Sequence, residues 1–300
     1  MRRYIKYIVV AVVIIILIIA IGILVTHQKK NAQIDDGKFK IVTSFYPIYI
    51  MTANITEGAK DIELVNMTDT NVGCIHNYTL TTQDMKKIER ADVLIENGLG
   101  LESFNDKMMN INKDLQILDS SQNLQNLIVE ENKTNPHIWT SITNYIAQVE
   151  NITKGLIEAN PENTEIYEKN SKEYIGKLTD LKLRYEVELQ LKGQTAVTLN
   201  ENFAYFGKEI GLNLTVIQTS HEESAISAET LKSVIEMMKQ TGSKIIIIDA
   251  EDNIKNAETI ASETGAKIYR LNSGTTGSMN KEAYINVMQD NLESLKNDEK

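Results

Sequence analysis

Residues 73–84 read Gly-Cys-Ile-His-Asn-Tyr-Thr-Leu-Thr-Thr-Gln-Asp, and residues 91–104 read Ala-Asp-Val-Leu-Ile-Glu-Asn-Gly-Leu-Gly-Leu-Glu-Ser-Phe. The first of these segments places His76 in a loop that precedes a short helix. Thr81 or Thr82 can cap this helix, because a hydroxyl there accepts a free backbone N–H of the first turn. The sequence therefore predicts a histidine held close to a helix start.

The remainder of the stretch predicts a helix followed by a buried strand. Met85 and Ile88 are the expected buried side chains of the helix, which should end near Arg90. Residues 93–95 are apolar and stop at the Asn97-Gly98 turn, as a strand of a parallel sheet with two covered faces does. One continuous unit therefore contains the loop with His76, the short helix, the buried strand and the glycine turn.

Strands and helices alternate along the rest of the chain. The predicted strands are residues 40–42, 62–65, 93–95, 115–118, 196–199, 214–217, 244–248 and 267–271. Further helices are predicted at residues 48–55, from 142 to about 152, and at 161–191, 228–240, 254–263 and 281–296. This alternation is typical of an α/β fold with parallel sheets and covering helices.

The helix predicted at residues 161–191 is long enough to join two separate sheets. It begins at Pro161 and repeats apolar side chains at three, four or seven residues up to Leu189. We therefore expect a first lobe at residues 39–160, this connecting helix at 161–192, and a second lobe at 193–300.

The amino terminus has a different composition. Residues 8–25 are an unbroken apolar run with basic residues on both sides, long enough for a membrane-spanning helix. A cleaved signal would have a shorter apolar part and a small-x-small site, so an uncleaved anchor at residues 1–27 is preferred over a signal. With residues 28–38 as a linker, the fold is then expected on the extracytoplasmic face of the cell membrane, or secreted if the segment is cleaved.

Charge and cysteine content limit the classes of function. The chain holds 31 basic and 41 acidic residues, for a net charge of −10. Such an acidic surface repels nucleic-acid phosphates and attracts cations, so no nucleic-acid partner is expected. Cys74 is the only cysteine, so it forms no internal disulfide, and it is either a small buried residue or an extra soft ligand beside His76.

A second loop histidine, His137, lies in Asn135-Pro136-His137-Ile138-Trp139. Two loop imidazoles suggest a metal site, because neutral imidazole is the commonest nitrogen ligand of zinc. The simpler interpretation is that His76 is an exposed loop residue and His137 packs on Trp139.

These residues resemble the substrate-binding proteins of zinc and manganese ABC importers. That family shows a loop histidine before such a helix, an Asn-Gly-x-Gly-x-Glu segment and a Pro-His-x-Trp, and the resemblance spans residues 39–298. It extends to Phe203-Ala204-Tyr205-Phe206, to residues 245–249 and to the closing Asn291-Leu292-Glu293. Relatives are often lipoproteins, whereas here a transmembrane helix would replace the lipid.

The resemblance implies two metal ligands from each lobe. His76 and His137 are the first-lobe pair, but the two positions of the second lobe hold Asn200 and Asn272. An uncharged carboxamide is a weak metal ligand, although its carbonyl oxygen can still contact the metal or water. Glu201, Asp249 and His221 are the three candidates that could strengthen the shell. Carboxylates at strand ends face the ligand crevice of α/β sheets, which favours Glu201 and Asp249 over His221.

The resemblance implies an extracytoplasmic protein that captures zinc or manganese in the cleft between its lobes and delivers it to an ABC permease. The alternative is a degenerate member that acts as a metal-independent surface adhesion or interaction protein. A two-histidine metallohydrolase is less well supported, because no motif places a general base. No zinc-protease helix, Gly-x-Ser-x-Gly or P-loop occurs, so no enzyme is expected.

Overall fold

The computed structural model describes residues 37–130, 132–217 and 226–296. Residues 39–300 belong to one compact unit. Within the described ranges, no helix has both the length and the apolar character needed to cross a membrane. The anchor predicted at residues 8–25 lies outside these ranges, as does His221.

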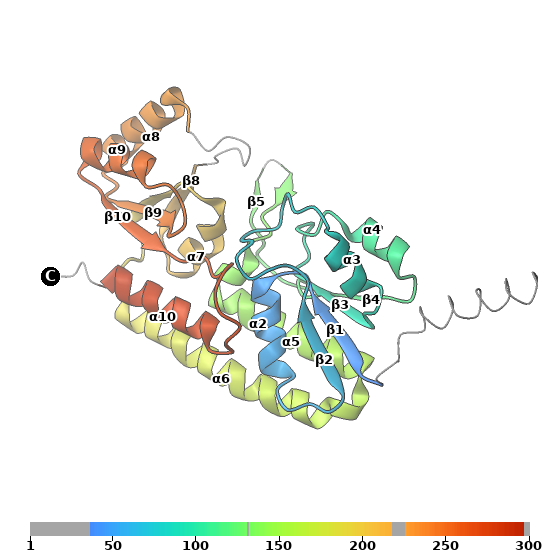
Figure 1. The fold of residues 1–300 in the computed structure, drawn as a ribbon. Helices are drawn as coiled ribbons and strands as arrows, with labels where there is room; N and C mark the ends of the chain where they lie inside the picture. The colour runs from blue at the N-terminus through green and yellow to red at the C-terminus, as the bar shows by residue number, and fades with distance from the viewer. Residues whose placement is uncertain (1–36, 131, 218–225, 297–300) are drawn as a thin grey trace, which may run out of the picture. The chain divides into compact units, whose positions relative to one another are not determined.

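The first sheet is entirely parallel, with strand order β2-β1-β3-β4 (Figure 1). All four residues of β3 are buried, which confirms the two-faced burial predicted for the strand before Asn97-Gly98. Its strands are β1 (Phe39–Thr43), β2 (Ile62–Asn66), β3 (Val93–Glu96) and β4 (Gln116–Asp119).

The second sheet is also parallel, with strand order β10-β9-β7-β8. Its strands are β7 (Thr195–Thr198), β8 (Asn213–Val216), β9 (Ile245–Asp249) and β10 (Lys267–Leu271). All four predicted strands of this lobe are therefore confirmed within one or two residues. A two-stranded antiparallel ribbon, β5 (Val129–Glu130) with β6 (Lys133–Thr134), was not predicted.

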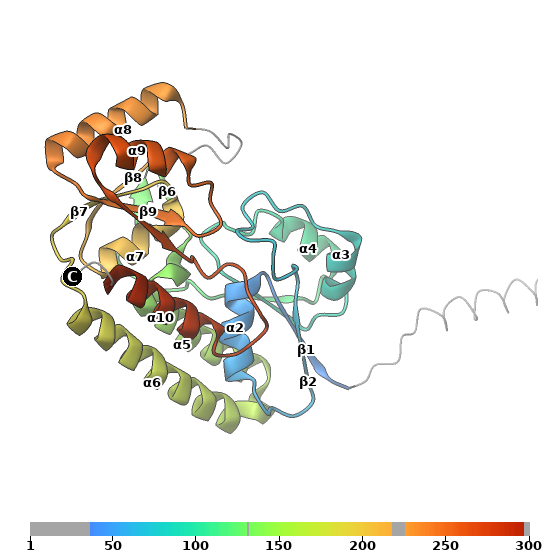
Figure 2. The same ribbon diagram turned by 60° about the vertical axis from the view of Figure 1, so that its left-hand side comes forward.

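The four isoleucines of β9 illustrate why both faces of the second sheet are covered. Ile246 and Ile248 join the core beneath α8 and α9, whereas Ile245 and Ile247 join the larger core that includes α7 and α10. Alternate side chains of a strand point to opposite faces, so the run supplies both cores. Figure 2 shows these two helix pairs on either side of the strands.

Nine helices cover the sheets in the described part of the chain. They are α2 (Tyr46–Ile55), α3 (Thr82–Ile88), α4 (Asn105–Ile111), α5 (Ile142–Ala159), α6 (Thr164–Glu188), α7 (Ala204–Glu209), α8 (Ala228–Thr241), α9 (Lys255–Thr264) and α10 (Ala283–Lys296). The sequence does not predict α4 and α7. Their seven and six residues are too few for a clear helical period, and no side-chain cap marks the start of either helix.

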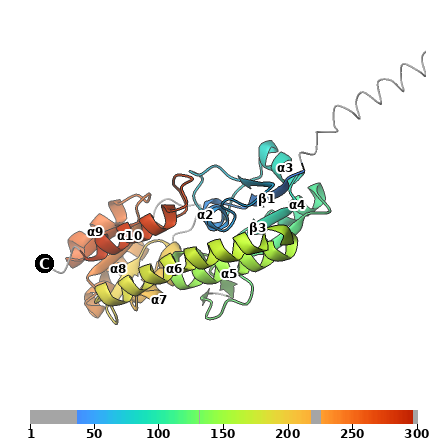
Figure 3. The same ribbon diagram turned by 90° about the horizontal axis from the view of Figure 1, so that it is seen from below.

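The long helix α6 joins the two sheets in the chain and packs beside α5 (Figure 3). Its buried side chains recur at helical spacing, as predicted. They are Tyr167, Ser171, Tyr174, Leu178, Leu181 and Tyr185. One core cluster extends from the first sheet through α5 and α6 to α10, and in it the rings of Tyr145 and Tyr284 stack at 3.5 Å.

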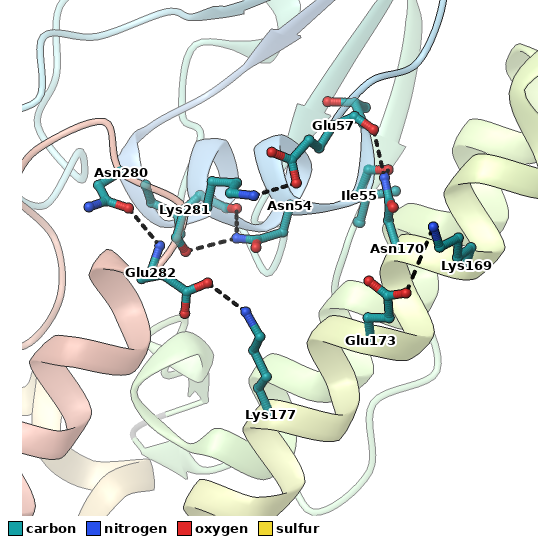
Figure 4. Close-up of polar contacts among 12 residues, drawn as sticks. Asn54, Ile55, Glu57, Lys169, Asn170, Glu173, Lys177, Asn280, Lys281 and Glu282 are labelled. Carbon is teal, nitrogen blue, oxygen red and sulfur yellow. Dashed lines mark hydrogen bonds and ion pairs between the residues drawn. The ribbon is translucent and has the colours of Figure 1, made fainter.

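Polar contacts tie the segment before α10 to the first lobe and to α6 (Figure 4). The amide of Asn54 donates to the backbone oxygen of Lys281 at 2.9 Å, and the Lys281 ammonium pairs with Glu57. Lys177 of α6 pairs with Glu282 at 2.6 Å. Exposed ion pairs contribute about 0–1 kcal/mol each, so they fix orientation more than they add stability.

The short helix after the His76 loop differs from the prediction in one respect. Thr81 caps α3, accepting from the Asp84 N–H while Asp84 accepts from the Thr81 N–H. Ile88 is fully buried as expected, but Met85 is 36% exposed. The prediction for Met85 was wrong, because Asp84 turns inward to complete the capping box and accepts a hydrogen bond from Tyr78 at 2.8 Å.

Candidate metal site

The His76 loop lies between β2 and α3. Ile75 is fully buried, whereas its neighbours Cys74 and His76 are half-buried. The capping box at Thr81 fixes the end of the loop where α3 begins. An apolar anchor and a capped helix therefore hold the imidazole and the thiol in place.

His137 is completely buried, and Asn135 sets its orientation. The side-chain oxygen of Asn135 lies 2.9 Å from both the backbone nitrogen and Nδ1 of His137. A backbone N–H can only donate, so this Asn135 atom is the acceptor oxygen and Nδ1 must carry the ring proton. The lone pair is then on Nε2, the geometry that suits a metal-ligating histidine.

Cys74, His76 and His137 come together although they lie in two distant loops. Their possible ligand atoms all lie within 4.8 Å of one another. Cys74 Sγ is 3.5 Å from His137 Nε2, and the two imidazole centroids are 5.0 Å apart. Among the described residues, this is the one group of three or more cysteine, histidine or acidic side chains with such geometry.

One separation in this cluster, 3.5 Å between Cys74 Sγ and His137 Nε2, matches that of a tetrahedral zinc site. Zinc binds imidazole nitrogen at about 2.0–2.1 Å and thiolate sulfur at about 2.3 Å, which leaves neighbouring ligand atoms roughly 3.5 Å apart. Burial raises the pKa of the Cys74 thiol to about 12, so without metal the sulfur keeps its proton. Its S–H can then donate to His137 Nε2.

Glu201 brings a carboxylate of the second lobe toward the cluster. It is the first residue of a short 3-10 helix, Glu201–Phe203, and its Oε1 lies 3.8 Å from His76 Nε2. Asn135 reaches the same residue, because its amide donates to the Glu201 backbone oxygen at 3.2 Å. The two lobes therefore meet at the histidines.

Asn200 uses its carboxamide locally. Its side-chain oxygen accepts from the Asn202 N–H at 2.9 Å and caps the 3-10 helix, while its amide donates to Asp252 at 3.1 Å. The carboxamide oxygen and amide nitrogen of Asn200 are thus both used in local hydrogen bonds, while the next residue, Glu201, is the one whose carboxylate contacts His76.

Asn272 and Asp249 are held in similar local arrangements. The side-chain oxygen of Asn272 accepts from the Gly274 N–H at 2.7 Å. Asp249 ends β9, is 6% exposed and accepts from the Glu251 N–H at 3.1 Å, and burial raises the pKa of its carboxyl group. Asp249 is not part of the cysteine–histidine cluster. Metal ligation by Asp249 or by Asn272 stays a prediction.

The Asn-Gly-x-Gly-x-Glu segment supports the His137 loop. The Glu102 carboxylate accepts from the Asn97 and Gly98 N–H groups at 2.8 and 3.1 Å and so shapes the turn after β3. The Asn97 side chain then donates to the backbone oxygen of Pro136 at 2.9 Å. The motif therefore positions the residue next to His137 through hydrogen bonds.

The sequence leaves the role of two residues of this site open. It allows Cys74 to be either a small buried residue or an extra soft ligand, and it assigns no role to Asn135. The available signals were the Cys-x-His spacing and an amide two residues before a histidine, both of which are weak without the fold.

Comparisons with known proteins show which family the chain belongs to. Residues 41–298 match the family described as zinc-uptake complex component A, periplasmic. The high-affinity zinc uptake system protein ZnuA of Bacillus subtilis is 30% identical over 291 residues, covering 89% of this chain and 90% of that protein.

Two further matches are also metal-binding proteins. The zinc-binding protein AdcA of Streptococcus pyogenes is 30% identical over 87% of this chain, which corresponds to 56% of that longer protein. The structure of the substrate-binding protein FpvC of Pseudomonas aeruginosa with Ni²⁺ has a TM-score of 0.77 at 25% identity, covering 87% of this chain and 96% of that one. The chain belongs to the periplasmic zinc-uptake component A family of metal-binding transport proteins.

Proposed function

We propose that this protein captures a divalent transition metal, zinc or manganese, between its two lobes and delivers it to an ABC permease. The observation that carries the proposal is the convergence of His76 and His137 with the Glu201 carboxylate 3.8 Å from His76. Two neutral imidazoles and one carboxylate suit such a cation, and no bond is made or broken in the cargo. The apolar segment at residues 8–25 would hold the protein at the extracytoplasmic face of the membrane.

The contacts between the lobes favour a nearly rigid carrier. The Trp139 ring nitrogen donates to the Ser273 backbone oxygen at 3.0 Å, and the Tyr284 hydroxyl donates to the Trp139 backbone oxygen at 2.9 Å. All three residues are buried. Wide hinge opening would break these bonds in the core, so release is expected through ligand exchange or a small tilt of the second lobe.

The alternative, a metal-independent adhesion or interaction protein, draws on the local use of Asn200 and Asn272 described above. Retention of a buried, tautomer-fixed His137 beside His76 argues against it, because such an arrangement has no evident use in adhesion. Metal capture is therefore the proposed function, and adhesion is the conclusion only if the titration below finds no metal binding.

Calorimetric titration of the full chain in mild detergent with Zn²⁺ and with Mn²⁺ tests the proposal. We expect tight one-to-one binding of at least one of these ions, weakened more than about 100-fold in His76→Ala, which removes a direct ligand. The matched control is Asn77→Ala, an exposed neighbour on the same loop, with unchanged affinity. Binding no tighter than that of surface carboxylates would reject metal capture and leave adhesion.

A further inference from the structure

We propose that Cys74 is a thiolate ligand of the metal site and makes it selective for thiophilic divalent cations, zinc among them, over manganese. This inference rests on the proposed function and adds a ligand that the resemblance to metal-binding proteins does not supply. Its basis is the position of Sγ, 3.5 Å from His137 Nε2 in the cluster with His76.

The hydrogen-bond arrangement shows which atoms a metal would meet. Asn135 fixes the ring proton of His137 on Nδ1, so Nε2 presents a lone pair toward Cys74. In the metal-free protein Sγ lies 3.5 Å from that nitrogen, so the S–H group can donate to its lone pair. A divalent cation can occupy the place of this proton: the S–H bond breaks, the proton passes to water, and a metal–sulfur bond forms without any change of oxidation state.

Charge balance also favours a thiolate. Two neutral imidazoles leave the whole +2 charge of the cation uncompensated, and the carboxamides of Asn200 and Asn272 carry no charge. A Cys74 thiolate supplies one negative charge beside His76 and His137. The Glu201 carboxylate, whose Oε1 lies 3.8 Å from His76 Nε2, supplies a second. One sulfur, two nitrogens and one oxygen then form a four-ligand set of the kind that zinc adopts.

The ligand type determines which cation gains most. Thiolate is a soft ligand that favours zinc, whereas manganese prefers oxygen ligands. Removal of the Cys74 sulfur should therefore weaken the binding of zinc more than the binding of manganese. We expect Cys74→Ser to lower the ratio of zinc affinity to manganese affinity by about 10-fold or more.

Cobalt(II) absorption spectroscopy on the full chain in mild detergent gives the direct test. Thiolate-bound cobalt has an intense sulfur-to-metal charge-transfer band in the near ultraviolet, and Cys74 is the only cysteine of the chain. We expect the band in the wild type and its loss in Cys74→Ser, with cobalt still bound. Asn77→Ala, on the same loop, should retain the band, and zinc and manganese titrations of the same proteins supply the affinity ratio.

The outcomes separate this inference from the proposed function. Cobalt binding without the band in the wild type, or an unchanged zinc-to-manganese ratio in Cys74→Ser, would refute sulfur ligation while leaving metal capture intact. Failure of the wild type to bind any of the three ions would refute both. If Cys74→Ser does not fold, the presence or absence of the wild-type band still decides the question.

Discussion

The Asn135 side-chain oxygen accepts from both the backbone N–H and Nδ1 of His137, each at 2.9 Å. The same side chain donates to the Glu201 backbone oxygen at 3.2 Å, and Tyr205 donates to the Asn135 backbone oxygen at 2.8 Å. The Asn135 side chain therefore sets the tautomer of His137 in the first lobe. It also holds the backbone of Glu201 in the second lobe.

We expect Asn135→Ala to weaken metal binding by about 10- to 100-fold, as loss of an orienting partner of a ligating histidine does. The Nδ1 proton then has no fixed acceptor, so the ring can turn and Nε2 is no longer held toward Cys74. Titration with Zn²⁺ measures the effect. Asn110→Ala, which removes an exposed amide of α4, is the control and should bind normally; equal affinities in all three proteins would contradict the orienting role.

Glu209, at the end of α7, caps the start of α5 across the lobes. Its carboxylate accepts from the Ile142 and Thr143 N–H groups at 2.6 and 2.9 Å. Glu209→Ala should lower the free energy of unfolding by about 1–2 kcal/mol, the usual cost of losing a cap with a favourable charge at a helix N-terminus. Urea denaturation checks this against Glu186→Ala, which removes an exposed charge of α6 paired with Lys182. Similar losses in both variants would argue against the cap.

Gly98 and Gly100 form a matched pair for testing the turn after β3. Both glycines have positive φ, +86° for Gly98 and +80° for Gly100. A Cβ added to Gly98 would lie 2.0 Å from an Asp119 carboxylate oxygen, whereas a Cβ added to Gly100 would have no atom within 4 Å. Gly100→Ala should cost about 1 kcal/mol from backbone strain alone. Gly98→Ala should cost at least about 1–3 kcal/mol more, because the neighbour must move. Equal unfolding midpoints for the two variants would show that Asp119 moves freely.

Glu102 gives the fold a predictable pH dependence. Burial, together with the nearby Glu96, raises the pKa of its carboxyl group from the ordinary 4.5 to about 8. Between these two values the folded protein holds a proton that the unfolded chain has released. The stabilisation is therefore complete below about pH 4.5 and is lost as the pH rises toward about 8.

Glu102→Gln removes this titration. The wild type should lose more stability than Glu102→Gln between about pH 5 and pH 8, measured as the change in urea midpoint of each protein. Because the substitution also alters the hydrogen bonds of the turn, only the pH-dependent difference is informative, not the absolute stability. Parallel pH profiles for the two proteins would mean that Glu102 is already ionised at the acidic end of this range.

The sequence by itself determined the order and type of most elements. Apolar periodicity and capping residues act over a few positions, so they specify β9 from four isoleucines and α6 from side chains repeated along one face. Met85 shows the limit even of this local reasoning, because an inward Asp84 replaced it in the buried stripe.

Only the tertiary structure decided which side chains meet. Cys74 and His137 are 63 residues apart, and their contact depends on how β2, β3 and the turn at Asn97 place two loops at one edge of a sheet. Likewise, Asn200 is used in local hydrogen bonds while Glu201 contacts His76, a geometry that no sequence spacing encodes. Local patterns fix elements because their interactions are local, whereas a site assembled from several loops depends on the packing of the whole fold.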